Sequence, residues 1–598
     1  DGLPPGGTGA AQGDPPPPPP PPPPLSAAVA ARVADLLGRM TLDEKIGQMT
    51  QVDRAYLASD SDIAAYGLGS ILSGGGSTPD PNTPTGWADM VDGYQRAALS
   101  SRLGIPILYG ADAVHGAGDV YGATLFPQNI GLGATRDPRL VQEIARATAE
   151  EMAGTGVSWN FAPSIMVARD PRSGRTYESF GKLPEIAASF STYVTGLQGT
   201  ALGAAPASVL ATAKHWLADG GTAGGAEFGD AQVSEAELRA IHLPPFLAAI
   251  RAGVGTVMIA HNSVDGTPAH AQRHLITDVL KGELGFRGIV VSDWGGTGDV
   301  SDDYPYAVRR LVDAGIDMVM VPYDYRTFIS TLRDEVNAGR VPLSRIDDAV
   351  TRILTRKLEL GLLERPFADR RFLPAVGSAA HRELARRAVR ASLVLLKNDG
   401  GLLPLSKSTP RIFVAGKSAD DVGNQAGGWT VEWQGRSGPI VPGTTILQGI
   451  RAAVAPGTTV TYARAAGGVD ASYAVAVVVV GETPYAEWYG DRTDALGLDA
   501  EDLETLGRVK ASGVPTVVVL VSGRPLVVTD LLPDWKALVA AWLPGSEGQG
   551  VADVLFGDHA PTGKLPLSWP RSASQLPLNV GQPGYDPLFP YGFGLGYR

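Results

Sequence analysis

The sequence predicts an α/β fold, with an N-terminal (β/α)8 TIM-like barrel at residues 26–365 and an α/β sandwich at residues 386–598. Two observations lead to this prediction. In the first region, short strand-like apolar runs alternate with amphipathic helical segments, as in a barrel. After a weakly patterned linker at residues 366–385, a second series of apolar runs begins. A doubly wound sheet is the alternative for the first region, because only about seven strands are recognisable.

The N-terminal segment, residues 1–25, is rich in glycine and proline, with an unbroken proline run from Pro15 to Pro24. Such a tract adopts an extended polyproline helix and does not enter a packed core, so we expect a spacer. A ligand for a proline-binding module is the alternative. A helix is expected from Leu25 to Met40, and Thr41 with Glu44 forms a capping box that begins the next helix.

The remaining elements follow from periodicity. Between strands, Pro138 to Met152 places its apolar residues on one face, which indicates a helix. The continuous apolar run from Val477 to Val480 is typical of a parallel strand covered on both faces. The expected strands begin near Leu68, Ile105, Val157, Ser208, Gly255, Gly288 and Asp317 in the first region, and near Ser392, Arg411, Ala474, Pro515 and Ala537 in the second.

Composition excludes several classes of function. The chain has 598 residues, too many for one core, and 44% of them are apolar. The formal charge is −12 without blocks of basic residues, which argues against a nucleic-acid partner. Cysteine is absent, so disulfides and thiol chemistry are excluded. No apolar run approaches the ~20 residues that a membrane helix needs. Because the sequence starts at Asp1 rather than Met, we expect a secreted protein, extracellular or periplasmic, whose signal peptide has been removed.

Polar residues follow nearly every strand of the first region. Because a barrel gathers the carboxyl ends of its strands on one face, these side chains should converge there. Asp293, after Ile289 to Val291, is read as a catalytic nucleophile, with helix N-cap as the alternative. The residues at the other strand ends are Asp112, His115, Arg169, Asp170, Arg175, Lys214, His215, His261 and Asn262.

The second region adds one polar loop, Gly481 to Asp491, with Glu482, Glu487 and Asp491 after a buried strand. Such a loop suits a general acid, and spacing alone does not choose between Glu482 and Glu487. Two carboxylates are the minimum equipment for breaking a glycosidic bond. Asp112, Arg175, Lys214 and His215 are suited to holding sugar hydroxyls.

Tryptophans suggest sugar-binding platforms. Trp429 and Trp433 lie four residues apart in a glycine-rich stretch, and Trp294 follows Asp293. An aromatic face can stack on the apolar C–H surface of a sugar ring, and core packing is the alternative.

Seven motifs in order resemble glycoside hydrolase family 3, in particular its two-domain exo-β-glucosidases and β-D-glucan glucohydrolases. They are YGADAVHG, ATLFPQNIGLGATRD, ARDPRSGRTYESF, AKHWLADGGT, VVSDWGG, GGWTVEWQG and GETPYAEWYGD. The resemblance implies that Asp293 is the nucleophile and Glu487 the acid/base. It assigns Asp112, Arg175, Lys214 and His215 to the terminal glucose, and Trp294 and Trp433 to the next subsite.

The chain departs from the family pattern beside the sugar pocket. His261 stands where relatives often have an aromatic residue, and Val264 replaces a tryptophan. We therefore include His261 among the substrate-binding residues, with its effect on specificity open.

The resulting hypothesis is a retaining, exo-acting β-glucosidase that releases glucose from β-glucans, oligosaccharides and β-glucosides by double displacement. The carboxyl groups should lie about 5–5.5 Å apart, as in retaining enzymes. The alternatives are a β-xylosidase, a transglucosylase and a non-catalytic sugar-binding protein. No cofactor or metal is expected, and the oligomeric state is not predicted.

Overall fold

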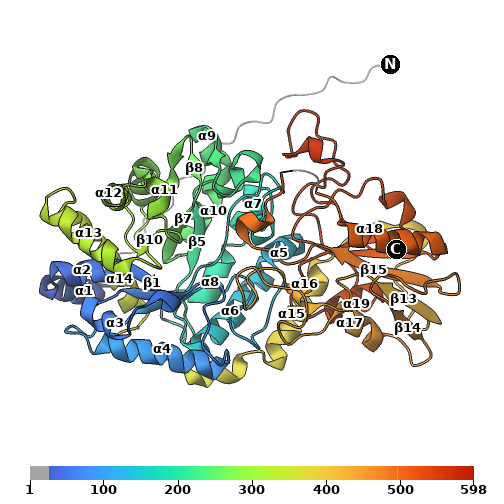
Figure 1. Cartoon of the computed structure of the whole chain (residues 1–598), viewed down its shortest axis with the longest axis horizontal. Coiled ribbons are helices and arrows are strands. Elements are labelled where there is room, and N and C mark those ends of the chain that lie inside the picture. The colour runs from blue at the N-terminus through green and yellow to red at the C-terminus, as the bar shows by residue number, and fades with distance from the viewer. Residues whose placement is uncertain (1–25, 494–495, 598) are drawn as a thin grey trace, which may run out of the picture.

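The computed structural model describes residues 26–493 and 496–597, so the proline tract lies outside the described residues. Two parts lie side by side, with the barrel on the left of Figure 1 and a mixed sheet on the right. Within the described residues, no helix combines the length and the apolar composition that crossing a membrane would require.

Eight parallel strands of the described residues form a closed ring. Two sheets, with strand orders β11-β1-β2-β3-β4 and β10-β7-β5, are joined by the bridges Trp159–Leu210 and Val291–Met318. The barrel prediction is therefore confirmed, and a doubly wound sheet is excluded. The strands are β1 (Thr50–Asp53), β2 (Ser70–Ser73), β3 (Leu108–Ala111), β4 (Trp159–Asn160), β5 (Thr212–Trp216), β7 (Thr256–Ile259), β10 (Ile289–Val291) and β11 (Val319–Met320).

The one barrel strand that the sequence did not reveal is β1. It follows α2 (Leu42–Gln48) directly, and all four of its residues are buried. Three of the four are polar. Thr50 donates to the Ile46 carbonyl (2.8 Å) and Gln51 Nε2 donates to Ser70 Oγ (2.8 Å), whereas Gln51 Oε1 is buried without a hydrogen-bond partner among the described residues. A search for apolar runs therefore cannot detect this strand, because most of its buried residues are polar.

Helices surround the ring, and the structure confirms the two helix features that the sequence predicted. The capping box at Thr41 and Glu44 is present, and the predicted face of α6 (Pro138–Thr155) is buried. The other helices are α1 (Ala27–Arg39), α3 (Ser61–Tyr66), α4 (Pro84–Leu99), α5 (Asn129–Thr135), α7 (Pro184–Ser189), α8 (Thr192–Gln198), α9 (Glu235–Glu237), α10 (Leu243–Arg251), a π-helical segment (His274–Glu283), α11 (Thr297–Val300), α12 (Tyr304–Ala314), α13 (Tyr325–Asn337) and α14 (Leu343–Glu359).

The second part is a six-stranded sheet in the order β12-β17-β16-β15-β13-β14, antiparallel only between β12 and β17. Five strands were predicted, and the edge strand β14 was missed because it is half-exposed and has no apolar run. Its elements are α15 (Ala379–Ser392), β12 (Val394–Asn398), β13 (Arg411–Ala415), α16 (Val422–Ala426), α17 (Ile446–Ala453), β14 (Thr459–Tyr462), β15 (Val475–Gly481), α18 (Ala500–Ser512), β16 (Thr516–Val521), β17 (Ala537–Trp542) and α19 (Gln549–Leu555).

The linker predicted at residues 366–385 includes a 3-10 turn, Arg370–Ala375, and the start of α15. The boundary itself stays a prediction.

A backbone-to-backbone contact joins the two parts where the site forms. A Cβ atom on Gly174 would lie 2.0 Å from the Glu487 carbonyl oxygen, so only glycine permits this approach. Across the same contact, Asp491 accepts hydrogen bonds from the N–H groups of Gly174 (2.8 Å) and Glu227 (3.1 Å). The loop after β15 is therefore fixed against the barrel face.

Candidate active site

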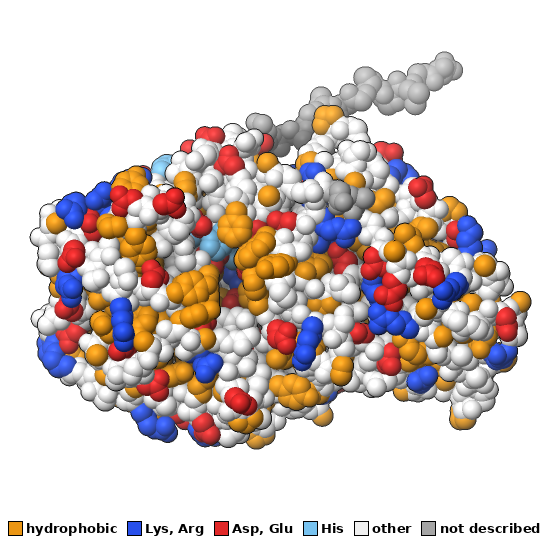
Figure 2. Space-filling model, viewed as in Figure 1, with side chains coloured by type: hydrophobic (Ala, Val, Ile, Leu, Met, Phe, Trp, Pro, Cys, Tyr) orange, Lys and Arg blue, Asp and Glu red, His pale blue; other side chains and the backbone are white. Residues whose placement is uncertain are grey.

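A cavity of about 700 Å³ opens between the carboxyl ends of the barrel strands and the second part of the chain. Figure 2 shows a hollow near the middle of this face, with apolar side chains on both sides. The cavity brings together the ten residues to which the sequence assigned a catalytic or substrate-binding role. They are Asp112, Arg175, Lys214, His215, His261, Asp293, Trp294, Trp429, Trp433 and Glu487. The other polar strand-end residues, His115, Arg169, Asp170 and Asn262, do not line it.

Asp293 lies just beyond the end of β10 and is held from several directions. Its backbone N–H donates to His270 Nε2 (3.0 Å), and its Oδ1 accepts from the Trp294 N–H (2.7 Å). His215 Nε2 lies 3.6 Å from Oδ2, and His261 Nε2 lies 3.5 Å from Oδ1. Each carboxylate oxygen therefore has its own imidazole neighbour.

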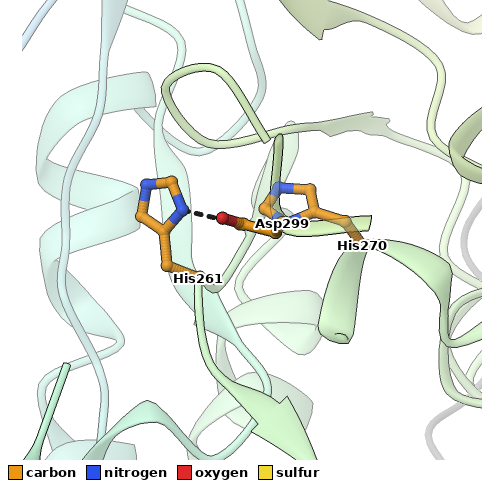
Figure 3. A group of neighbouring side chains, drawn as sticks. All are labelled: His261, His270 and Asp299. Carbon is orange, nitrogen blue, oxygen red and sulfur yellow. Dashed lines mark hydrogen bonds and ion pairs between the residues drawn. The ribbon is translucent and has the colours of Figure 1, made fainter. Parts of the chain in front are cut away.

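Each of these imidazoles is held from behind by another aspartate. His215 Nδ1 lies 2.8 Å from Asp219 Oδ2, and His261 Nδ1 lies 2.7 Å from Asp299 Oδ2 (Figure 3). Such pairs fix the ring orientation, because the carboxylate accepts the Nδ1 proton and turns Nε2 toward Asp293.

The electrostatics of the two histidines differ. Burial and the Arg175 guanidinium lower the pKa of His215 well below its ordinary value. Burial also lowers the pKa of His261, but the Asp293 and Asp299 carboxylates outweigh it and raise this pKa well above the usual range. Burial raises the pKa of Asp293, yet the charged His261 and Arg175 hold it well below the ordinary value. Asp293 is thus an ionised carboxylate beside an imidazolium.

His261, His270 and Asp299 also form a group with atoms close enough to ligate a metal ion (Figure 3). His270 Nε2 accepts the Asp293 N–H, so in a neutral ring the proton must be on Nδ1. That Nδ1 lies 3.0 Å from Asp299 Oδ2 without a well-aligned hydrogen bond. A metal on Nδ1 would move the proton to Nε2, against the backbone donor. The donor set therefore fits a proton-bearing network better than a metal centre.

Glu487 approaches the same cavity from the second part of the chain. Its backbone has φ of +55°, in the left-handed region that non-glycine residues rarely occupy, which directs the side chain toward the barrel. Burial raises its pKa, Arg175 opposes this, and the Glu227 and Asp293 carboxylates add to it, so that the pKa lies well above the ordinary value. Glu487 therefore retains its proton at a higher pH than an ordinary glutamate.

Arg175 connects three carboxylates. Its Nη1 lies 2.7 Å from Glu227 Oε1 and 3.2 Å from Glu487 Oε1, and its Nη2 lies 3.0 Å from Glu178 Oε2. Nearby, Lys214 Nζ donates to Asp112 Oδ1 (2.9 Å). These buried groups present fixed donors and acceptors at the inner end of the cavity.

The other acids and polar strand ends have different positions. Glu482, the alternative acid, accepts from Arg524 Nε (2.9 Å) and the Tyr485 hydroxyl (2.8 Å) and does not line the cavity. His115 is buried and lies 3.2 Å from the Trp429 carbonyl, where it contacts the second part of the chain. Neither Glu482 nor His115 faces the cavity, and both have a structural role.

The tryptophans form walls. Trp429 is buried at 6% exposure and donates to Glu178 Oε1 (3.3 Å), whereas Trp294 and Trp433 are half-buried. Cβ atoms on Gly74 and Gly75 would lie 2.7 Å from the Trp294 ring and 2.5 Å from Trp433 Cβ, respectively. The glycine turn therefore separates the two indoles without filling the space.

Sequence reasoning missed several residues around the site. Glu178 lies three positions after Arg175, where a helical spacing could have indicated it. Asp219, Glu227, His270 and Asp299 sit in segments without periodicity, so their contacts appear only in three dimensions.

Comparisons with known proteins agree with this architecture. The glycosyl hydrolase family 3 N-terminal domain matches residues 41–356, and the C-terminal domain of the same family matches residues 393–597. A lysosomal beta glucosidase from Dictyostelium discoideum is 35% identical, with 94% of this chain and 76% of that protein aligned. A periplasmic beta-glucosidase from Salmonella typhimurium is 33% identical, with 95% and 80% aligned.

Among solved structures, an exo-1,3/1,4-beta-glucanase from a Pseudoalteromonas species has a TM-score of 0.91 and 41% identity, covering 96% of this chain and 75% of that one. Both domain matches, their order and the aligned lengths confirm the resemblance seen in the motifs. The chain belongs to glycosyl hydrolase family 3.

Proposed function

We propose that this glycoside hydrolase is a retaining, exo-acting β-glucosidase that removes terminal glucose from β-glucans, oligosaccharides and β-glucosides. One observation carries the proposal: two carboxyl groups face one cavity with their pKa values shifted in opposite directions, Asp293 downward and Glu487 upward. A pair of this kind supplies a nucleophile and a general acid at the same pH.

In the proposed reaction, Asp293 attacks the anomeric carbon while Glu487 gives its proton to the departing glycosidic oxygen. The product is a glycosyl-enzyme ester, with the leaving group released as an alcohol. Glu487, now a carboxylate, takes a proton from water, whose oxygen attacks the anomeric carbon and frees Asp293. The imidazolium of His261 compensates the charge of the carboxylate before attack and after its release.

The glucose clamp is assigned to Asp112, Arg175, Lys214 and His215, which line the cavity around Asp293. Charged donors and acceptors on rigid strand ends hold a sugar in one orientation. Trp294 and Trp433 would bound the sugar on the leaving-group side. The names of the relatives, two beta-glucosidases and an exo-1,3/1,4-beta-glucanase, support the glucose preference and the exo mode.

We also propose an exported location, extracellular or periplasmic. The periplasmic relative supports it. Fractionation of cells that express the full-length gene tests it, and activity confined to the cytoplasmic fraction would contradict it.

Substitution of the two carboxyl groups tests the function. Asp293→Ala should reduce hydrolysis of aryl β-glucosides to background, because no nucleophile remains. Glu487→Gln should cost about 10²–10⁴-fold with unactivated leaving groups, which need protonation, and much less with dinitrophenyl glucoside. NMR of the first product should detect the β-anomer. An α-anomer, or equal loss on both leaving groups, would contradict the assigned roles.

The contact at Gly174 provides a second test. In Gly174→Ala, the new methyl group meets the Glu487 carbonyl and displaces the acid, and a misplacement of ~1 Å costs about 100-fold. The loss should be greater for disaccharides than for activated aryl glucosides. Gly93→Ala on α4 is the control, because nothing lies within 4 Å of its Cβ position. Comparable losses on both substrate types would mean that Glu487 does not depend on this contact.

The pH profile tests the imidazolium. Asp293 must be ionised to attack, so kcat/KM rises as the pH increases past the pKa of Asp293. The titratable and charged groups around the Asp293 carboxylate are His215, His261, Arg175, Asp112 and Glu487. Asp299→Asn removes a carboxylate that keeps His261 protonated, so the pKa of Asp293 should increase. The acidic limb should therefore move to higher pH by about 1–3 units. Asp302→Asn, which removes an exposed charge nearby, is the control. A uniform loss of activity with an unmoved limb would assign Asp299 a structural role only.

A further inference from the structure

Large exposed apolar side chains gather around the mouth of the active-site cavity. Of the described residues, Tyr56, Phe228, Tyr323 and Trp488 line the cavity and remain 41–56% exposed, and Tyr489, at 65%, packs beside Trp488. Folded proteins rarely leave contiguous apolar surface in water unless it binds something. The catalytic proposal above uses none of these five rings.

The rings form two walls. In the first wall, Tyr323 packs edge-on against Trp294 (5.6 Å between centroids) and accepts a hydrogen bond from Trp294 Nε1 (2.6 Å). Tyr56 continues this wall, 4.6 Å from Tyr323. The first wall is therefore Trp294, Tyr323 and Tyr56, running outward from the residue next to Asp293.

The second wall comes from the other part of the chain and from one barrel loop. Trp488 lies 5.0 Å and Tyr489 5.6 Å from Trp433, measured between ring centroids. Phe228, carried by the loop before β6 (Asp230–Ala231), lies 5.2 Å from Trp488. The second wall is therefore Trp433, Trp488, Tyr489 and Phe228.

Exposure increases from the floor of the cavity to its mouth. Trp429 is 6% exposed, Trp294 and Trp433 are half-buried, and the outermost rings are about half exposed or more. Charge changes in the opposite sense, because the charged clamp and both catalytic carboxyl groups surround the inner end. Asp53, another acid that lines the cavity, accepts hydrogen bonds from the N–H groups of Gly74 and Ala55 (2.7 Å each) and from Ser77 Oγ (3.1 Å).

We propose that the outer rings of the two walls form an additional glucan-binding site, which takes the third glucosyl unit counted from the non-reducing end of a β-linked gluco-oligosaccharide. This inference rests on the proposed function, because the first two units occupy the clamp and the Trp294–Trp433 pair. The site is uncharged and aromatic, which suits a neutral chain whose sugar faces are apolar and whose rims carry hydroxyl groups. Tyrosine hydroxyls at the rim add hydrogen-bonding partners.

The experiment compares kcat/KM for di-, tri- and tetrasaccharides of the β-1,3 and β-1,4 glucose series, with an aryl β-glucoside as a further substrate. The wild-type protein should prefer the trisaccharide to the disaccharide in at least one series. Tyr56→Ala and Trp488→Ala, one from each wall and both lining the cavity, should each reduce the trisaccharide-to-disaccharide ratio by about 2–10-fold. Tyr323→Phe should reduce it less, because the ring remains.

Phe367→Ala is the matched control, since Phe367 is similarly exposed at 45% but does not line this cavity. An unchanged ratio in both wall variants would overturn the inference while leaving the β-glucosidase proposal intact. An equal loss on the aryl glucoside would also overturn it, by assigning the rings to any hydrophobic leaving group. Absence of hydrolysis of every β-glucoside by the wild-type protein would instead overturn the proposed function.

Discussion

The approach of the Glu487 loop to the Gly174 turn is the constraint on which the site depends. With no side chain at Gly174, two backbones from different parts of the chain meet, and Asp491 fixes the contact through two N–H groups. This contact places Glu487 against Arg175, which already binds Glu178 and Glu227. One guanidinium cannot balance three buried carboxylates, so the arrangement favours a protonated Glu487.

Asp293 experiences the opposite environment. Two imidazoles face its oxygens, each supported by its own aspartate, and only His261 is held in the charged form. Burial acts on both catalytic candidates in the same sense, so the neighbouring charges create the difference between them. A carboxyl among carboxylates keeps its proton, and a carboxyl among cations loses it. The proposed division into acid and nucleophile is thus a property of the surroundings.

Along the cavity, the chemistry changes from charged to aromatic. The inner end is formed by residues at the ends of strands. These positions are rigid, which suits side chains that hold one sugar in a single orientation. The outer end is built from loops of both parts of the chain, whose exposed rings can accept successive units of a neutral polymer without a unique orientation. This order, with a specific inner position and tolerant outer ones, fits removal of one terminal sugar at a time from chains of different length.

The sequence alone predicted the two-part α/β fold, the barrel, the family resemblance and ten of the residues that line the cavity, because strand periodicity, polar residues at strand ends and contiguous motifs are local signals. It missed β1, whose buried residues are mostly polar and give no apolar run, and β14, a half-exposed edge strand. It left Glu482 and Glu487 equivalent by spacing. Tertiary structure separated them, since Glu482 is bound to Arg524 and Glu487 faces the cavity. Only the tertiary structure revealed the His261–Asp299 pair and the aromatic walls. Their members come from loops far apart in the sequence, so their contacts leave no spacing pattern in the chain.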